Sequence, residues 1–211
     1  MSFNNYVITI DRKIGSKGIY TGQKIAEHFG FNYVDKDILR KAADVFHIAP
    51  EKLQNIDEKA SSFWRSFVQT SNYDSPNIPG YQYMPTRRQV FEVQSAIIRN
   101  SVRESSCVVV GRGGNAIFQG YEKHVGIFLH GNKEFRILNA AEYLGVGIED
   151  AIKAVERVDR ERARYHNTYA GYTWTDASNY DLCIDVSKAG VDNAVSLIID
   201  YIEDRFPELK K

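Results

Sequence analysis

The sequence predicts one α/β domain with a five-stranded parallel sheet and helices on both faces of the sheet. Five short apolar runs alternate along the chain with longer segments of helical periodicity, as in repeated strand–helix units. The runs are apolar at nearly every position, and such strands are typical of sheets that are covered on both faces. A chain of 211 residues can bury one large core, whereas two independent domains would both be small. In such folds ligands bind at the C-terminal ends of the strands.

The expected strands and helices are placed by residue type and spacing. The strands are short apolar runs, and the helices have apolar residues three and four positions apart. The strands are expected at residues 6–10, 31–34, 107–110, 125–129 and 182–186. The main helices are expected at 23–29, 35–46, 90–102, 133–144, 148–164 and 191–202, with a further short helix within 50–60.

A glycine-rich turn joins the first expected strand to the first expected helix. Gly15, Gly18 and Gly22 permit a backbone path that other residues resist, and Lys17 adds a cation. A strand that leads through such a turn into a helix directs unpaired amides at one point, which favours a bound phosphate. The turn departs from both G-x-x-x-x-G-K-[ST] and G-x-G-x-x-G, so a turn that needs glycine only for its geometry is an equal alternative. On the phosphate hypothesis the nucleotide contacts come from Gly15, Ser16, Lys17, Gly18, Ile19 and Tyr20.

Charge and cysteine content argue against several classes of function. Lysine plus arginine equals aspartate plus glutamate at 27 each, so no overall field attracts the protein to nucleic acid or to an anionic membrane. No apolar run reaches the length of a membrane span and the first residues lack the features of a signal peptide, so we expect a cytoplasmic protein. Cys107 and Cys183 lie in apolar runs and are predicted to be buried thiols. A homodimer is compatible with these features.

The segment 48–88 differs in character from the rest of the chain. Within it, aromatic residues are scattered among Ser, Asn, Pro and Gly without a sustained period. We expect an insertion that is mobile or that covers a substrate. Its aromatic side chains could stack on a base, but loop packing or an oligomer contact is the favoured interpretation.

The expected helix 148–164 contains a dense group of charges. Three arginines and one glutamate fall on one face of this helix at helical spacing. They are Arg157, Arg160, Glu161 and Arg164. Three guanidinium groups on one face can bind several phosphate oxygens and neutralise charge on a phosphoryl group in transfer. Taken alone, the segment is more simply interpreted as a solvent-exposed face with internal ion pairs.

Several stretches of the chain, in one order, resemble segments of cytidylate kinases. They are GRGGNAIF from residue 111, IFLHGNKEFRI from 127, ERVDRERAR from 156 and NYDLCIDVSKAGVDNAV from 179. With the loop at residues 15–18 they look more like the bacterial cytidylate-kinase-like family. The resemblance covers residues 6–44 and 90–206 and fades across 48–88. Several weak motifs in one order are more specific than any one of them.

The resemblance implies a three-layer P-loop kinase fold in which 1–211 form one kinase-like domain with an arginine-bearing helical lid over 148–178. It implies a small nucleotide substrate, with ATP and Mg²⁺ as cofactors, and we assign no metal ligand to any side chain. The implied catalytic residues are Lys17, Arg157, Arg160 and Arg164. The implied substrate-binding residues are Arg40 (or its neighbour Lys41), Arg112, Asp35 and Glu161.

Three departures from the family pattern concern the loop and the substrate. Lys17 and Gly18 stand nearly where the family has Gly-Lys, Gly113 replaces an acid on the nucleoside side, and Glu161 stands where the lid has Asp. The preference for cytosine is therefore open.

Together these features predict an ATP-dependent phosphotransferase of cytidylate-kinase type, converting (d)CMP to (d)CDP. One alternative is a kinase fold that acts as a nucleotide sensor or scaffold with impaired catalysis, and another is a kinase for a different small acceptor. A dinucleotide-binding oxidoreductase is suggested only by the glycine spacing and by Asp35, about twenty residues after Gly15, and leaves the arginine group unexplained.

Overall fold

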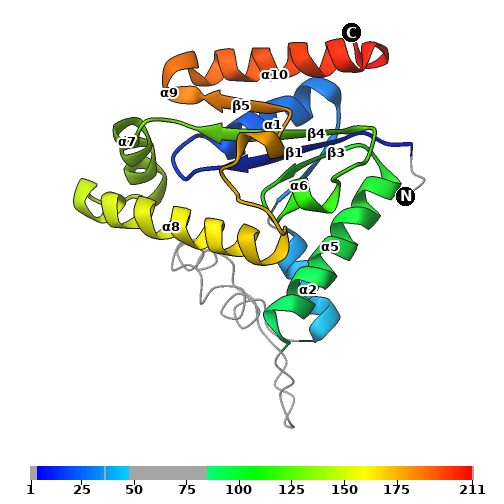
Figure 1. Ribbon diagram of the computed structural model, residues 1–211, viewed down its shortest axis with the longest axis horizontal. Coiled ribbons are helices and arrows are strands. Elements are labelled where there is room, and N and C mark those ends of the chain that lie inside the picture. The colour runs from blue at the N-terminus through cyan, green and yellow to red at the C-terminus, as the bar shows by residue number, and fades with distance from the viewer. Residues whose placement is uncertain (1–3, 36, 48–84, 211) are drawn as a thin grey trace.

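A parallel sheet forms the centre of the fold (Figure 1). The structure is a computed structural model that describes residues 4–35, 37–47 and 85–210. Its strands are β1 (Val7–Arg12), β2 (Asn32–Val34), β3 (Cys107–Val110), β4 (His124–His130) and β5 (Leu182–Asp185). They are hydrogen-bonded in the order β2-β3-β1-β4-β5, and every pair is parallel. The predicted five-stranded α/β fold is confirmed.

Helices cover both faces of the sheet (Figure 1). On one face lie α1 (Gly18–Phe29) and α10 (Val191–Arg205), and on the other lie α5 (Arg87–Glu104) and the short α6 (Gly114–Ile117). The helix α2 (Asp37–Phe46) packs on α5, while α7 (Lys133–Leu144) and α8 (Ile148–Tyr169) pack on each other. Short elements complete the description: α9 (Val186–Ala189), η1 (Ala177–Asn179) and η2 (Pro207–Leu209).

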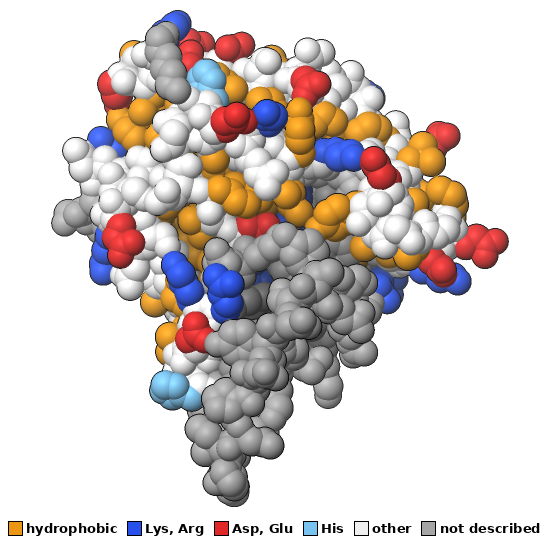
Figure 2. Space-filling view, turned by 180° about the vertical axis from the view of Figure 1, so that it is seen from behind, with side chains coloured by type: hydrophobic (Ala, Val, Ile, Leu, Met, Phe, Trp, Pro, Cys, Tyr) orange, Lys and Arg blue, Asp and Glu red, His pale blue; other side chains and the backbone are white. Residues whose placement is uncertain are grey.

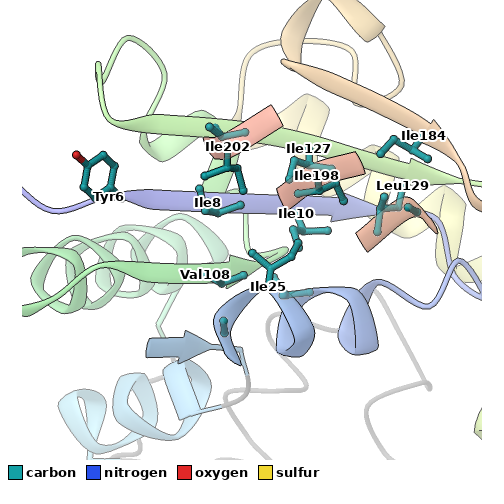
Figure 3. Close-up of a cluster of buried hydrophobic side chains, with 14 of the residues drawn as sticks. Tyr6, Ile8, Ile10, Ile25, Val108, Ile127, Leu129, Ile184, Ile198 and Ile202 are labelled. Atoms are coloured by element: carbon teal, nitrogen blue, oxygen red, sulfur yellow. The ribbon is translucent and has the colours of Figure 1, made fainter. Parts of the chain in front are cut away.

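Alternate residues of the central strand β1 contribute to two separate cores. Ile8 and Ile10 point toward α1 and α10, where they pack with Ile25 and Ile198 (Figure 3). Val7 points to the opposite face and packs in a cluster with residues of α5 and α6. Burial of each such side chain stabilises the folded state by on the order of 2 kcal/mol. Packing on both faces of the sheet therefore holds β1 in place. The loop that follows β1 therefore starts from a fixed point.

Two helices extend beyond their predicted bounds for identifiable reasons. The first begins at Gly18 rather than at residue 23, because Lys17 adopts a left-handed conformation and serves as its N-cap. The helix α8 continues to Tyr169 rather than ending at 164. Its last turns are held by aromatic packing, since Tyr169 stacks on Phe91 with ring centroids 5.0 Å apart.

One prediction about the cysteines is wrong. Cys107 in the interior strand β3 is buried as expected, but Cys183 is exposed. The reason is topological, because β5 is an edge strand and that side of it is not covered. The expected helix at 50–60 and nearly all of the segment 48–88 lie outside the described residues.

Surface charge agrees with the balanced composition. Over the described part of the face shown in Figure 2, lysine and arginine side chains are interspersed with aspartate and glutamate side chains. Among the described helices, none is both long enough and apolar enough to cross a membrane.

Candidate active site

The candidate site lies at the C-terminal edge of the sheet, beside the loop between β1 and α1. The chain passes from β1 to β2 and β3 on one side of the sheet, and then returns to place β4 on the other side. Ligands of open α/β sheets bind at such a reversal point. A cavity of about 470 Å³ opens there, and all six residues predicted to contact the nucleotide, from Gly15 to Tyr20, line it. The other lining residues are Arg12, Lys13, Ile14, Gln23, Asp35, Asn139, Tyr143, Arg162, Val191 and Asp192.

Glycine is needed at the first turn of this loop because the backbone there touches α7. Gly15 has φ 78°, and a Cβ at that position would lie 2.1 Å from the carbonyl oxygen of Arg136. The next turn has Lys17 at φ 55°, a conformation that L-residues seldom adopt. Beyond it, the first amides of α1 have no acceptor within the helix, so they remain available to an anion in the cavity.

Polar contacts from α7 and α8 hold the loop in this position. Asp159 accepts hydrogen bonds from the backbone amide of Ile14 at 3.0 Å and from Nη1 of Arg136 at 2.6 Å. The same nitrogen of Arg136 also donates to the carbonyl oxygen of Ile14 at 3.3 Å. The side chain of Ile14 packs between the two helices, against Ala140 and Val158. Sequence reasoning did not single out Arg136 or Asp159, and their only signal was a pair of opposite charges on two helices consecutive in the chain.

Two further arginines line the cavity, and sequence reasoning missed both. Arg12 is the last residue of β1, and Arg162 comes from the middle of α8. Nη1 of Arg162 donates to the carbonyl oxygen of Arg12 at 2.7 Å. Arg162 lies within the charged stretch that the sequence analysis examined, but on the face of α8 opposite to the three arginines predicted to act.

Lys17 lies at the mouth of the cavity, where it forms an ion pair. Its Nζ donates to Oε2 of Glu142 on α7 at 2.8 Å, and both side chains are substantially exposed. The hydrogen bond from Lys17 lowers the pKa of the Glu142 carboxyl group. Exposed pairs of this kind are weak, about 0–1 kcal/mol, so the contact does not prevent Lys17 from moving to a bound anion.

The three predicted lid arginines lie outside the cavity. Arg157, Arg160 and Arg164 are all exposed on α8, and none of them lines the cavity. Glu161 is partly buried beside them, and burial raises the pKa of its carboxyl group. In this arrangement the three side chains do not reach the cavity, so their role at the phosphates remains a prediction.

The residues predicted on the acceptor side are dispersed. Asp35 lines the cavity and is only 6% exposed. It accepts a hydrogen bond from the hydroxyl of Tyr33 at 3.3 Å. Arg112, after β3, donates to Gln94 on α5 and lies over the ring of Tyr165, while Arg40 is exposed on α2.

A buried polar cluster lies under the segment that follows α8, next to the cavity. Asp11 of β1 accepts a hydrogen bond from the hydroxyl of Tyr180 at 3.1 Å and lies 3.5 Å from Nε2 of His166. Both Asp11 and His166 are at least 95% buried by side chain. Burial is the main cause that lowers the pKa of His166 and raises that of Tyr180. The cluster fixes the C-terminal part of α8 on the sheet.

A family model, the cytidylate kinase-like family, matches residues 7–188. The chain belongs to this family. Membership of the cytidylate kinase-like family identifies the chain as a kinase, an enzyme that transfers a phosphoryl group. Its P-loop kinase fold agrees with this. The predicted family and the predicted enzyme class are both confirmed.

Named relatives have low sequence identity to the chain but nearly full coverage. The cytidylate kinase of Pyrococcus horikoshii is 26% identical over 207 residues, which are 96% of this chain and 93% of that protein. The cytidylate kinase of Methanopyrus kandleri is 27% identical over 202 residues, or 91% of this chain and 90% of that protein.

Solved structures show the same fold. An uncharacterized protein from Eubacterium ventriosum superposes with a TM-score of 0.69 at 25% identity, covering 94% of this chain and 99% of that one. Shikimate kinase from Bacteroides thetaiotaomicron has a TM-score of 0.54 at 7% identity and covers 94% and 98%. At that identity the second likeness concerns the fold alone.

Proposed function

We propose that the chain transfers the γ-phosphoryl group of ATP to a nucleoside monophosphate in the cytoplasm, with CMP and dCMP as the first candidates. The observation that supports this most is the glycine loop from β1 into α1, which borders the cavity at the reversal point of the sheet. The choice of acceptor is supported by the family and by the names of its relatives.

The loop supplies two kinds of phosphate contact in this proposal. The backbone amides from Gly15 to Tyr20 contact the phosphate chain, because the left-handed conformations of Gly15 and Lys17 turn the loop along the cavity. Lys17 exchanges its weak, exposed pair with Glu142 for a contact to the phosphates. Positioning and charge neutralisation are the main requirements of phosphoryl transfer, so no nucleophilic side chain is needed.

The residues at the cavity fit magnesium only as a companion of the phosphates. Among the described residues, no group of three or more His, Cys, Asp or Glu side chains could hold a metal by itself. Asp35 is buried at the cavity, and one of its carboxylate oxygens has no hydrogen-bond partner among the described residues. Mg²⁺ bound with nucleotides commonly takes one or two carboxylates and otherwise phosphate and water oxygens, so Asp35 would hold it, directly or through water. The ion would supply charge neutralisation at the phosphates.

The lid residues enter the proposal through the family resemblance. We assign Arg157, Arg160 and Arg164 to the phosphates in transfer, although they do not line the cavity in this arrangement. On the acceptor side we assign Asp35, Arg40, Arg112 and Glu161. A closed site excludes water and brings arginine charge to the phosphoryl group at the moment when its charge is redistributed.

A direct assay tests this function. Purified full-length protein is incubated with ATP, Mg²⁺ and each of a panel of nucleoside monophosphates, and ADP release is followed. Turnover above the rate without acceptor is expected with CMP or dCMP. Turnover with another acceptor alone would show a kinase of different specificity, and binding of ATP without any turnover would show the nucleotide sensor.

The role of Lys17 is tested by calorimetry with ATP. Lys17→Ala is expected to weaken ATP binding about tenfold, because one cation is lost from the phosphate site. Lys24→Ala is the matched control, since Lys24 lies on the same helix and also forms an exposed ion pair, with Glu27 at 3.0 Å. Equal ATP affinity in both variants and the wild type would show that Lys17 stays with Glu142.

A further inference from the structure

Two arginines that are far apart in the sequence both line the cavity of the candidate site. Arg12 ends the central strand, Arg162 lies 150 positions later on α8, and both line the cavity. Nη1 of Arg162 donates to the backbone carbonyl of Arg12 at 2.7 Å, so the helix and the strand end are joined at this point. Lys17 points instead to the exposed carboxylate of Glu142.

The side chain of Arg12 occupies a groove that only glycines leave open. A Cβ at Gly18 would lie 2.7 Å from Cγ of Arg12, and a Cβ at Gly111 would lie 1.8 Å from its Nη1. Any side chain at either position would displace the arginine. The guanidinium of Arg12 is therefore held between the start of α1 and the end of β3, which is the edge of the sheet where ligands bind.

The surroundings of Arg162 do not balance its charge. Loss of water on burial is the main cause that lowers the pKa of Arg162, and the neighbouring charge of Arg12 lowers it further. The carboxylates of Asp159, Asp11 and Asp35 act in the opposite direction but do not offset these two effects.

Each of those three carboxylates already has other partners. Asp159 accepts from Arg136 and from a backbone amide of the loop. Asp11 accepts from the hydroxyl of Tyr180, and Asp35 from that of Tyr33. Arg12 and Arg162 are partly buried beside carboxylates that also bind other groups, so an added anion stabilises them more than it would stabilise a fully exposed pair.

We propose that Arg12 and Arg162 form the principal cationic site for a polyphosphate chain in this protein. Both provide forked donors suited to phosphate oxygens, and both adjoin the loop whose amides face the same cavity. The assignment deepens the proposed function and rests on it in one respect, namely that ATP is the source of the polyphosphate. In this proposal the two arginines supply most of the cationic contact to the phosphates, and Lys17 adds a weaker one.

Calorimetric titration with inorganic tripolyphosphate, and with ATP in the absence of any acceptor, tests the site. Arg12→Met and Arg162→Met are each expected to weaken tripolyphosphate binding by at least tenfold. Arg103→Met is the matched control because Arg103 is exposed near the C-terminus of α5, at the opposite edge of the sheet. The affinity of this variant for tripolyphosphate should stay within twofold of the wild type. Wild-type affinity in both cavity variants, or no binding of tripolyphosphate by the wild type, would overturn the proposal.

A merely structural role of Arg162 makes the opposite prediction for stability. If the hydrogen bond to the carbonyl of Arg12 were its purpose, Arg162→Met would lower the thermal midpoint of the anion-free protein. An unbalanced cation predicts an unchanged or higher midpoint together with a smaller rise on adding tripolyphosphate. A lower midpoint with an unchanged rise on tripolyphosphate would overturn the proposal. Arg162→Lys retains the charge without the fork, and an affinity equal to the wild type would contradict the requirement for arginine.

Failure of this inference and failure of the proposed function give different results. Tripolyphosphate binding is measured without an acceptor, so it does not depend on phosphoryl transfer. Binding that requires Arg12 and Arg162, combined with no turnover on any acceptor, would reject the kinase reaction and retain the anion site. Turnover that is unchanged by both substitutions would reject the arginine anion site and retain the kinase reaction.

Discussion

The two faces of α8 have the same spacing of polar residues and very different surroundings. The inward face presents Asp159, Arg162 and His166, three and four positions apart, and each contacts the loop after β1 or the end of β1. The outward face presents three arginines at the same intervals, and all three are exposed. The inward face thus holds the loop and presents Arg162 to the cavity, whereas the outward face is exposed to solvent. These outward arginines are Arg157, Arg160 and Arg164.

Arginine on α8 therefore has two separate uses in this protein. On the inward face, charge is held at low solvent exposure, where an unmatched group is costly and a matched one fixes geometry. On the outward face, charge is hydrated and contributes little to stability until a partner excludes water. Substitutions that change stability and turnover independently can therefore separate the two faces.

The largest expected effect on stability comes from the inward carboxylate. Asp159→Asn leaves Arg136 without its ionised partner and weakens the bond to the amide of Ile14, and we expect a loss of about 3 kcal/mol in the free energy of unfolding. Urea denaturation followed by circular dichroism measures this change. Asp150→Asn is the control, because Asp150 is exposed in the first turn of the same helix. Equal stability of the two variants would show that the inward face does not hold α8.

A smaller effect is expected from acid, through buried neutral histidines. Burial lowers the pKa of His124 to about 4 and also lowers that of His166, so both are neutral in the folded protein near pH 7. The unfolded chain takes up these protons below about pH 6.5, so stability is complete above that pH and falls as the pH decreases toward 4. The contribution of His124 amounts to a loss on the order of 2 kcal/mol at pH 5.

Unfolding free energies at pH 7 and pH 5 measure this acid sensitivity. His166→Gln and His124→Gln should each reduce the difference between the two pH values. His47→Asn is the control, because His47 is exposed at the end of α2 and asparagine tolerates its left-handed backbone conformation. If the loss of unfolding free energy between pH 7 and pH 5 is the same in all the variants, the acid sensitivity comes from carboxylates instead.

The smallest effect on stability is expected from the outward face. Arg157→Ala and Arg164→Ala should each change the free energy of unfolding by no more than about 0.5 kcal/mol, because both side chains are exposed. Steady-state assays should nevertheless show turnover reduced at least tenfold if these side chains reach the phosphates. Lys153→Ala on the same helix is the control for a lost surface cation. Transfer rates equal to the wild type in both arginine variants would remove the outward face from the mechanism.

The fold could be predicted from the sequence because its determinants are local. Each strand contains a short apolar run, and these runs placed the strand ends within two residues. The loop 15–20 could be located in the same way, because glycines between a predicted strand and a predicted helix mark a turn there, and these residues line the cavity. Cys183 was misplaced because an edge strand cannot be told from an interior one by composition.

The cationic part of the site could not be predicted because it depends on packing between distant segments. Periodicity shows which residues of α8 share a face, but both faces contain arginine, and only contact with α7 and Ile14 decides which one turns inward. Arg12 was missed because the direction of a strand's last side chain is set by its neighbours, here the glycines at 18 and 111.

The position of β1 at the middle of the sheet affects how the protein is made. Its hydrogen-bonded neighbours begin at Cys107 and His124, so this strand is synthesised about a hundred codons before the strands with which it pairs. At a synthesis rate of ~10 residues per second that delay is on the order of ten seconds. During this interval an apolar segment has neither edge paired, which makes the nascent chain a natural client for chaperones that bind extended peptides.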